Sequence, residues 1–283
     1  DLAPDPMLDK RTWDRLLASA LQSTGLVLTQ LGVYEMADEV LARAHNAIRD
    51  SANPHQIYVH LVNRARLLIG WGLRLERVDN FDEAGERFAT ASAIATAVEG
   101  PFRESLHPGR RDRSAAEQVP VIGAAHALAK PGAEHIARLW ALRELAMYAR
   151  ELIIVSIALA RCLEMEELPQ QALQVLHDAR DRLEHDTSEP TLMLCLTREY
   201  ARMSGPHGER TISALQTYAT ALEVELWLMQ EARTATLLTR RDHERLTRAH
   251  GAIAQQALHD PLTGLPNRRA LDDRLAALIN AQT

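Results

Sequence analysis

Histidine and cysteine are the residue types in this sequence that could carry metal or nucleophilic chemistry, and neither is placed for it. Of the twelve histidines, His243 and His250 lie seven residues apart and therefore share one helix face. Both have arginine neighbours, which repel cations, and no further ligand completes a set there. Cys162 lies in a strongly apolar stretch, which is typical of a core residue. No glycine-rich phosphate loop and no Ser/His/Asp signature stands out, so we expect neither a metal site nor a catalytic residue here.

The most distinctive string of the sequence, HDPLTGLPNRRAL, occupies residues 259–271. Pro261 ends a helical pattern, Gly264 permits a tight turn, and Asn267 can cap the amphipathic segment after it. The two leucines of its Leu-Thr-Gly-Leu portion would be buried between the helix that ends at Pro261 and the amphipathic segment after Asn267. The string therefore predicts a sharp joint between a long helix and a further folded element.

This string resembles the opening of a GGDEF domain, the catalytic domain of diguanylate cyclases. Such domains begin with Asp-x-Leu-Thr-Gly-Leu-x-Asn-Arg directly after a signalling helix. The resemblance covers residues 259–283, and its matching positions form a signalling hinge made of Asp260, Leu262, Thr263, Gly264, Leu265, Asn267 and Arg268.

The resemblance implies an activity that these 283 residues do not themselves carry. Diguanylate cyclases condense two GTP into cyclic di-GMP, and each catalytic domain of a dimer holds one GTP. The metal-binding carboxylates, the guanine contacts and the Gly-Gly-Asp/Glu-Glu-Phe turn of that family lie further downstream. No catalytic residue is therefore carried over, no cofactor is expected in this chain, and Mg²⁺ with GTP is expected in the missing catalytic domain.

Composition places the chain among soluble globular proteins. It has 283 residues, which suggests about two domains, with 25% charged and 46% apolar residues and a net charge of −6. The two cysteines suit a reducing compartment, no apolar run is long enough to cross a bilayer, and no signal peptide opens the chain. We therefore expect a cytoplasmic protein without a membrane partner. The acidic balance also disfavours nucleic acid, although arginine clusters at 110–113 and 233–248 leave a DNA-associated regulator as an alternative.

Helical periodicity runs through almost the whole chain. Apolar residues recur at intervals of three and four, and alanine and leucine, both strong helix formers, dominate. Four prolines between 99 and 132 predict an insertion or mobile loop there, while Pro169 and Pro190 fit the first turns of helices. The predicted class is all-α, with helices at 11–30, 33–50, 55–77, 80–98, 133–166, 169–185, 190–203 and 209–258.

Three segments repeat one pattern, in which a small residue precedes an Ala-x3-large-x2-Ala helix face by twelve positions. A small residue in the first helix lets the second helix approach closely. The alanines of the second helix allow an equally close approach on its other face. A weaker fourth copy has Ala214, Tyr218 and Ala221, with Arg202 in the place of the small residue. The three full copies are Gly25, Ala37, Leu41 and Ala44; Gly72, Ala84, Phe88 and Ala91; and Ala160, Ala172, Leu176 and Ala179.

At these residues the chain resembles the tetratricopeptide repeat (TPR) family, over about residues 18–186. It departs from the family where Arg49, Thr96 and Glu184 replace the usual proline, and where the repeat spacing exceeds 34 residues. Grooves of this family usually hold peptides or protein segments. The resemblance therefore implies a groove for a protein, peptide or small-molecule signal. The polar residues that would point into this groove are Gln22, Thr29, Arg66, Glu76, Arg161 and Glu164. The same residues are equally compatible with a solvated face.

The stretch 209–258 lacks proline and is long enough for a continuous helix of some 50 residues. Its apolar residues alternate by threes and fours, meet a polar interval from Arg233 to His243, and resume one residue out of phase. A parallel dimeric coiled coil with two competing registers fits this pattern. The alternative is that the first half packs on the repeats and the second half is solvated. The predicted coiled-coil seam consists of Ile212, Leu215, Ala219, Leu222, Leu226, Met229, Leu246 and Ile253.

Together these patterns predict a TPR-like antiparallel helical array at 1–205, a signalling helix at 206–258 and the start of a GGDEF domain at 259–283. The function they favour is sensory and dimerisation control of a diguanylate cyclase, so that the parent protein, rather than this chain, would be the enzyme. The alternative is a TPR-type scaffold that binds a protein partner and has no catalytic output.

Overall fold

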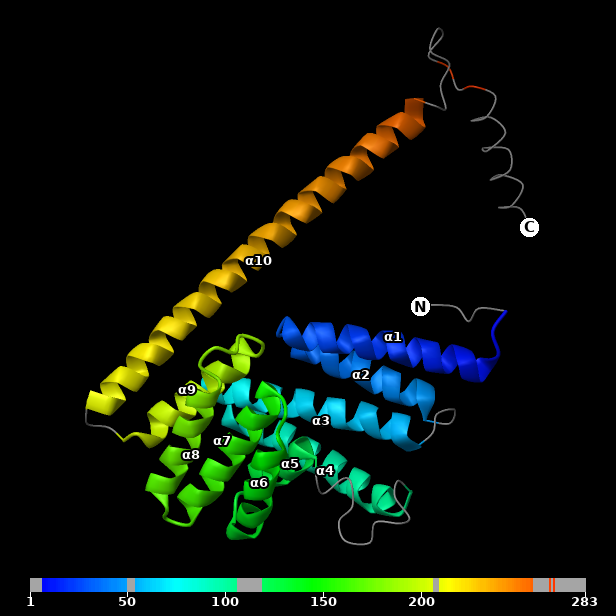
Figure 1. Ribbon diagram of the computed structural model, residues 1–283. Helices are drawn as coiled ribbons and strands as arrows, with labels where there is room; N and C mark the ends of the chain where they lie inside the picture. The colour runs from blue at the N-terminus through cyan, green and yellow to red at the C-terminus, as the bar shows by residue number, and fades with distance from the viewer. Residues whose placement is uncertain are drawn as a thin grey trace. The chain divides into compact units, whose positions relative to one another are not determined.

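The computed structural model describes residues 7–49, 54–105, 119–205 and 209–256, together with Leu265 and Asn267. Within these residues the chain is all-helical and contains no strand (Figure 1). The helices are α1 (Lys10–Gln30), α2 (Tyr34–Ile48), α3 (Pro54–Arg77), α4 (Phe81–Ser105), α5 (Pro120–Ala129), α6 (Ala133–Leu145), α7 (Ala149–Met165), α8 (Pro169–Arg182), α9 (Pro190–Met203) and α10 (Glu209–Gln256). The chain divides into two units, 1–222 and 223–283, and α10 extends across this boundary.

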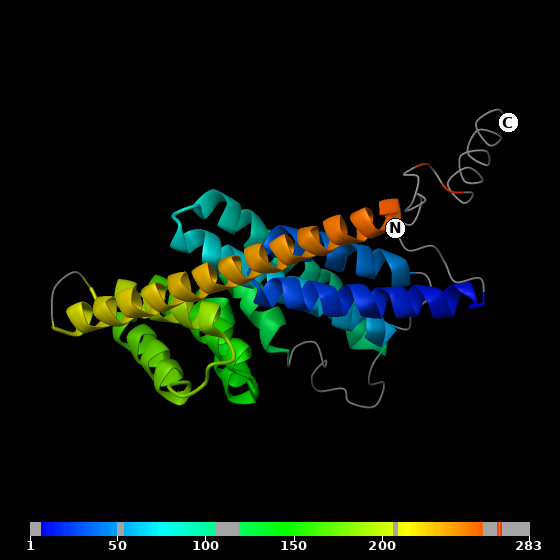
Figure 2. The ribbon, with the colours of Figure 1, turned by 90° about the horizontal axis from the view of Figure 1, so that it is seen from above.

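The first unit is built from helical hairpins whose two helices pack along their length (Figures 1 and 2). Three-residue connections join α1 to α2, α3 to α4 and α7 to α8, so the helices of each pair must run antiparallel. All twelve residues of the three sequence repeats are buried in these pairs. A Cβ atom added to Gly25 would lie 2.7 Å from the Leu41 side chain, and one added to Gly72 would lie 2.5 Å from the Phe88 ring. The small residue therefore receives the large residue of the partner helix, as its type and spacing predict.

The three hairpins also share one turn geometry. Gly32, Asp79 and Glu167 each lie two residues after the first helix and adopt a positive φ, of 74°, 59° and 59°. In each turn the next residue's amide donates to a carbonyl of the preceding helix, at 2.9 Å from Val33, 3.0 Å from Asn80 and 2.9 Å from Leu168. This left-handed helix stop is easiest for glycine, which occurs only in the first copy. The repeat thus extends from the packed faces into the backbone of the turns.

Helix α5 occupies the centre of this unit, where a loop was expected. Of its ten residues, eight are buried, and it contacts α3, α4, α6 and α7. Pro120 starts it, and α4 continues through Gly100 and Pro101 to Ser105. The expectation of a loop is therefore wrong for the described ends of 99–132, and residues 106–118 lie outside the described part. An apolar helix of ten residues forms here because neighbours on all sides cover it.

One predicted helix, 133–166, is two helices in the structure. The backbone is extended at Ala146 (ψ 113°) and Tyr148 (ψ 147°), and α7 restarts at Ala149. The Glu151 carboxylate accepts a hydrogen bond from the Met147 amide at 3.4 Å, close to this break. Nine consecutive residues of α7, 152–160, are buried, so this helix needs cover on every side. The chain turns back at 146–148 and lets α6 supply part of that cover.

Candidate functional site

Two arginines and three carboxylates join α3, α7 and α9 in a single ion network. Arg161 on α7 donates to both oxygens of Glu76 on α3, at 2.9 and 2.6 Å, and to both oxygens of Glu199 on α9, at 2.8 and 3.2 Å. Arg202 on α9 donates to both oxygens of Glu164, at 2.9 and 2.6 Å, and to Glu199 at 3.0 Å. Paired contacts of this kind are among the strongest ionic hydrogen bonds in proteins. The network holds α9 against both other helices.

Burial and charge act in opposite directions on this network. Burial alone would raise the pKa of Glu199, which is 3% exposed, but Arg161 and then Arg202 outweigh it and hold that pKa below the ordinary value of 4.5. Burial would lower the pKa of Arg161, but Glu199 and Glu76 raise it. Both partners therefore stay charged at neutral pH, and the network is a salt bridge rather than a neutral hydrogen bond.

A second ionic cluster joins the same three helices about ten residues earlier. Arg66 on α3 lies 3.9 Å from Glu151 on α7, and Arg150 lies 3.4 Å from Glu189, the cap of α9. Burial first, and then Arg150, lower the pKa of Arg66, whose buried Nε has no hydrogen-bond partner. Ten residues of helix correspond to about 15 Å, so α9 is tied to its neighbours near both ends.

The predicted groove residues therefore do different things. Three of them take part in the ion network that joins α3, α7 and α9: Glu76, Arg161 and Glu164. Sequence reasoning did not connect these residues to α9. The Thr29 hydroxyl donates to the Gly25 carbonyl at 2.7 Å, within its own helix. Gln22 lines a hollow between α1 and α3. Glu199 was not predicted, because a single acid on an amphipathic helix carries no sign of its partner.

Helix α10 presents two apolar faces in its first half. Ala214 is 3% exposed, and Tyr218 and Ala221 are half-buried, so the face of the weak fourth repeat is largely covered. At 100° per residue the centre of the predicted seam lies about 110° around the helix from this face. Most of the described seam residues are exposed: Ile212 by 59%, Leu215 by 52%, Leu226 by 58%, Met229 by 53% and Leu246 by 60%, with Ala219 exposed and Leu222 half-buried. The side chain of Ile253 lies outside the described part.

The polar interval of α10 is fully solvated in the described chain. The four side chains Arg240, Asp242, His243 and Glu244 are exposed, and Arg240 and Arg248 both pair with Glu244, at 3.2 and 3.7 Å. Surface pairs of this kind contribute little to stability. The helical conformation of this interval is therefore held mainly by the backbone hydrogen bonds of α10.

The fourth repeat is more open than the other three, since only Ala214 of its three face residues is buried. Arg202 stands where the other copies have glycine or alanine, and its guanidinium serves the ion network. A hollow of about 330 Å³ lies between α8, α9 and the start of α10, with Tyr200 and Ala214 among its lining residues.

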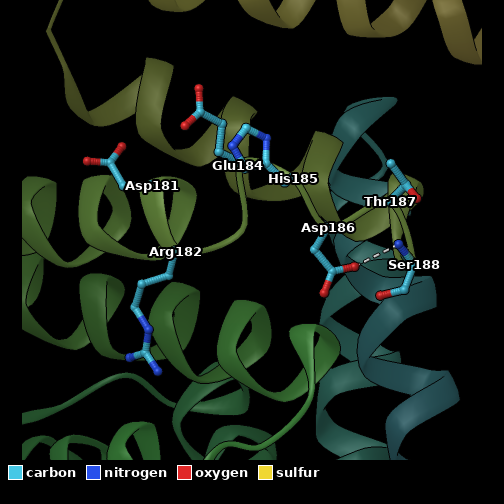
Figure 3. Close-up of a pocket in the computed structure, with 7 residues that line it drawn as sticks. All are labelled: Asp181, Arg182, Glu184, His185, Asp186, Thr187 and Ser188. Carbon is cyan, nitrogen blue, oxygen red and sulfur yellow. Dashed lines mark hydrogen bonds between the residues drawn. The ribbon is translucent and has the colours of Figure 1, made fainter.

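The hollow in Figure 3 has an acidic lining without the geometry of a metal centre. It has a volume of about 550 Å³ and an exposed lining from the end of α8 and the connection after it, made of Asp181, Arg182, Glu184, His185, Asp186, Thr187 and Ser188. The carboxylates point in different directions, and Asp186 accepts a hydrogen bond from the Ser188 amide at 2.8 Å (Figure 3). In the described part of the chain, no three His, Cys, Asp or Glu side chains are grouped as metal ligands.

The two cysteines lie in the core. Cys162 is fully buried and Cys195 is 4% exposed. Burial raises the pKa of both thiols, that of Cys195 to about 11, so neither is a thiolate at neutral pH. Cys162 is thus a core residue, as predicted.

The signalling hinge falls almost entirely outside the described residues. Asp260, Leu262, Thr263, Gly264 and Arg268 are not described, whereas Leu265 is 64% exposed and Asn267 is half-buried.

No described helix combines the length and apolar character needed to cross a bilayer. No family model matches the chain, and neither the curated proteins nor the solved structures contain a match.

Proposed function

We propose that this chain is the regulatory and dimerisation module of a cytoplasmic diguanylate cyclase. The observation that carries the proposal is the string at 259–271, directly after the 48-residue helix α10. A GGDEF domain beginning at this string would follow α10, the helix that comes next in the chain after α9 and its ion network. The cyclase reaction joins two GTP held by separate domains, so the facing of those domains controls its rate.

The dimer contact in this proposal is the exposed seam of α10. The covered face of Ala214 is occupied within the first unit, whereas the seam leaves large apolar side chains in water, which is unfavourable for a long isolated helix. A parallel pair of α10 helices would bury this seam. The polar interval and the change of phase beyond it would then permit two registers, and a signal bound by the repeats would favour one.

The TPR-like identity of the three hairpins belongs to the same proposal. Their support is the shared contact of small and large residues and the shared left-handed turn. These features equally favour the second candidate, a TPR-type scaffold that binds a protein and has no catalytic output. The two candidates differ in the coding sequence beyond Thr283 and in whether α10 dimerises.

Light scattering on the 283-residue chain tests the dimer. The wild-type chain and the Thr220→Asp variant should be dimers, because Thr220 lies on a third, exposed face of α10. Leu226→Asp should give a monomer with unchanged helix content, because it places a charge in the seam. A wild-type chain that is monomeric at every accessible concentration would rule out the coiled-coil mechanism.

The coding sequence beyond Thr283 tests the enzymatic part. The proposal requires a further domain with paired acidic metal ligands and a Gly-Gly-Asp/Glu-Glu-Phe turn. A reading frame without such a domain would reject the cyclase and favour the scaffold.

A further inference from the structure

A hollow of about 280 Å³ lies between α1, the end of α2 and α3, away from the ion network. Its floor is apolar and consists of Leu26, Ile48 and Val59, of which Ile48 is only 2% exposed. Its walls are polar and consist of Arg15, Ser19, Gln22, Ser23, His55, Gln56 and His60. A volume of this size is near the lower end of the range for small-molecule sites.

Two polar atoms of the lining residues have no partner in the present arrangement. The Gln22 Oε1 and the His60 Nδ1 are cut off from solvent, and neither makes a hydrogen bond within the described chain. Most buried polar atoms in native proteins are paired, and an unpaired one is destabilising. Both residues line the hollow, so a small rotation of either side chain would bring its unpaired atom within reach of a polar group bound there.

The charge of the lining favours an anion. Among the ten described residues that line the hollow, none is acidic, whereas Arg15 carries a positive charge. Burial and the nearby His45 lower the pKa of His60, so His60 acts as a neutral hydrogen-bonding group. Arg15 is exposed at the rim, and its Nε donates to the Arg11 carbonyl at 3.2 Å, on the same helix. A guanidinium at the rim of an apolar hollow matches a carboxylate attached to a hydrocarbon part.

We propose that this hollow binds a small organic acid that has a short hydrocarbon chain and one further polar group. The carboxylate lies at Arg15, the chain lies on Leu26, Ile48 and Val59, and the further polar group satisfies Gln22 and His60. This ligand class deepens the sensory role proposed above and rests on it for its biological purpose. The binding itself depends only on the first unit.

Calorimetric titration of the whole chain tests the site with four probes: hexanoate, 3-hydroxyhexanoate, 1-hexanol and hexylamine. Both acids should bind with one site per chain, and the hydroxy acid should bind more tightly. Hexanol should bind more weakly than hexanoate, and hexylamine should not bind. Equal binding of hexanoate and hexylamine, or no binding of either acid at millimolar concentration, overturns the proposal.

Two exposed arginines provide a matched pair of variants. Arg15→Gln should weaken hexanoate at least tenfold, whereas Arg11→Gln removes the same charge from the same helix outside the hollow and should leave it unchanged. Ser19→Trp should block both acids by filling the hollow. Circular dichroism confirms that each variant is folded. Equal effects of the two arginine variants would place the acid elsewhere and overturn the site.

The outcome is separable from that of the dimer experiment. Acid binding by a monomeric chain would reject the coiled-coil mechanism and retain this site. A dimeric chain that binds neither acid would do the reverse.

Discussion

Gly72 of α3 and Phe88 of α4 pack so closely that a Cβ atom at position 72 would lie 2.5 Å from Cε1 of the phenylalanine ring. We therefore expect Gly72→Ala to lower the free energy of unfolding by about 1–3 kcal/mol, because the ring must leave its rotamer or the helices must separate. Urea unfolding followed by circular dichroism measures the change.

Gly85→Ala is the matched control, because nothing lies within 4 Å of a Cβ atom at that helical position. It should stabilise the protein by about 0.5–1 kcal/mol through helix propensity. Phe88→Leu, which recreates the Ala160 and Leu176 pairing of the third hairpin, should offset part of the loss in the double variant. If both glycine variants were equally destabilising, the packing explanation would be wrong.

Arg161→Met should be among the more damaging single changes in the ion network. It leaves the carboxylates of Glu76 and Glu199, which are 13% and 4% exposed, without their shared partner. The expected loss in the free energy of unfolding is about 3–5 kcal/mol. Chemical denaturation measures it, with Arg240→Met as control, because Arg240 is 76% exposed and its pair with Glu244 should contribute less than about 1 kcal/mol.

Replacing all three members of this cluster distinguishes charge imbalance from simple loss of contact. Glu76→Leu, Arg161→Met and Glu199→Leu together should recover most of the lost stability, because no unpaired charge is then buried. A triple variant as unstable as Arg161→Met alone would show that the ion pairs themselves stabilise the fold.

One part of the pH dependence of stability comes from the lowered pKa of Glu199. A carboxylate whose pKa is lower in the folded chain stabilises the fold fully above its unfolded pKa, and this contribution is lost as the pH falls through the folded pKa. We expect the urea midpoint to decrease as the pH falls below the ordinary value of 4.5. Glu199→Gln should flatten this decrease relative to wild type, and an unchanged slope would exclude Glu199 as its source.

Glu167→Gly should stabilise the protein. Glu167 is exposed and has a φ of 59°, a conformation that a side chain disfavours by about 1–2 kcal/mol and glycine does not. Thermal unfolding should therefore show a higher midpoint. Glu166→Gly, at the preceding residue with a φ of −89°, should not raise it. A rise in both variants would point to removal of negative charge instead.

The repeated alanine pattern made most of the hairpin packing predictable, because Ala37, Ala84 and Ala172 mark faces where two helices touch. The turns were only partly predictable. Gly32 suits a left-handed residue and Asp79 tolerates that conformation, but Glu167 adopts the same geometry without a sequence signal.

Two features could not be predicted because tertiary contacts decide them. The loop expectation rested on the four prolines of 99–132, but Pro120 takes the first position of α5 and burial on all sides stabilises this short helix. The break between α6 and α7 contains neither glycine nor proline and arises from the need to cover α7. Likewise Gln22 was predicted as a binding residue, but Arg15 and His60 were not, because only the packing of α1 on α3 shows that they share a hollow.

The ion network of Glu76, Arg161 and Glu199 also governs how this sequence can change over generations. Since Arg161 is the shared partner of two acids, its neutral replacement leaves both carboxylates beside the core without it, whereas loss of either acid leaves Arg161 paired with the other. A lineage that loses Arg161 first must pass through a less stable ancestor or gain stability elsewhere beforehand, whereas one that loses an acid first avoids this step. We therefore expect descendants of this chain that lack Arg161 to lack at least one of the two acids as well.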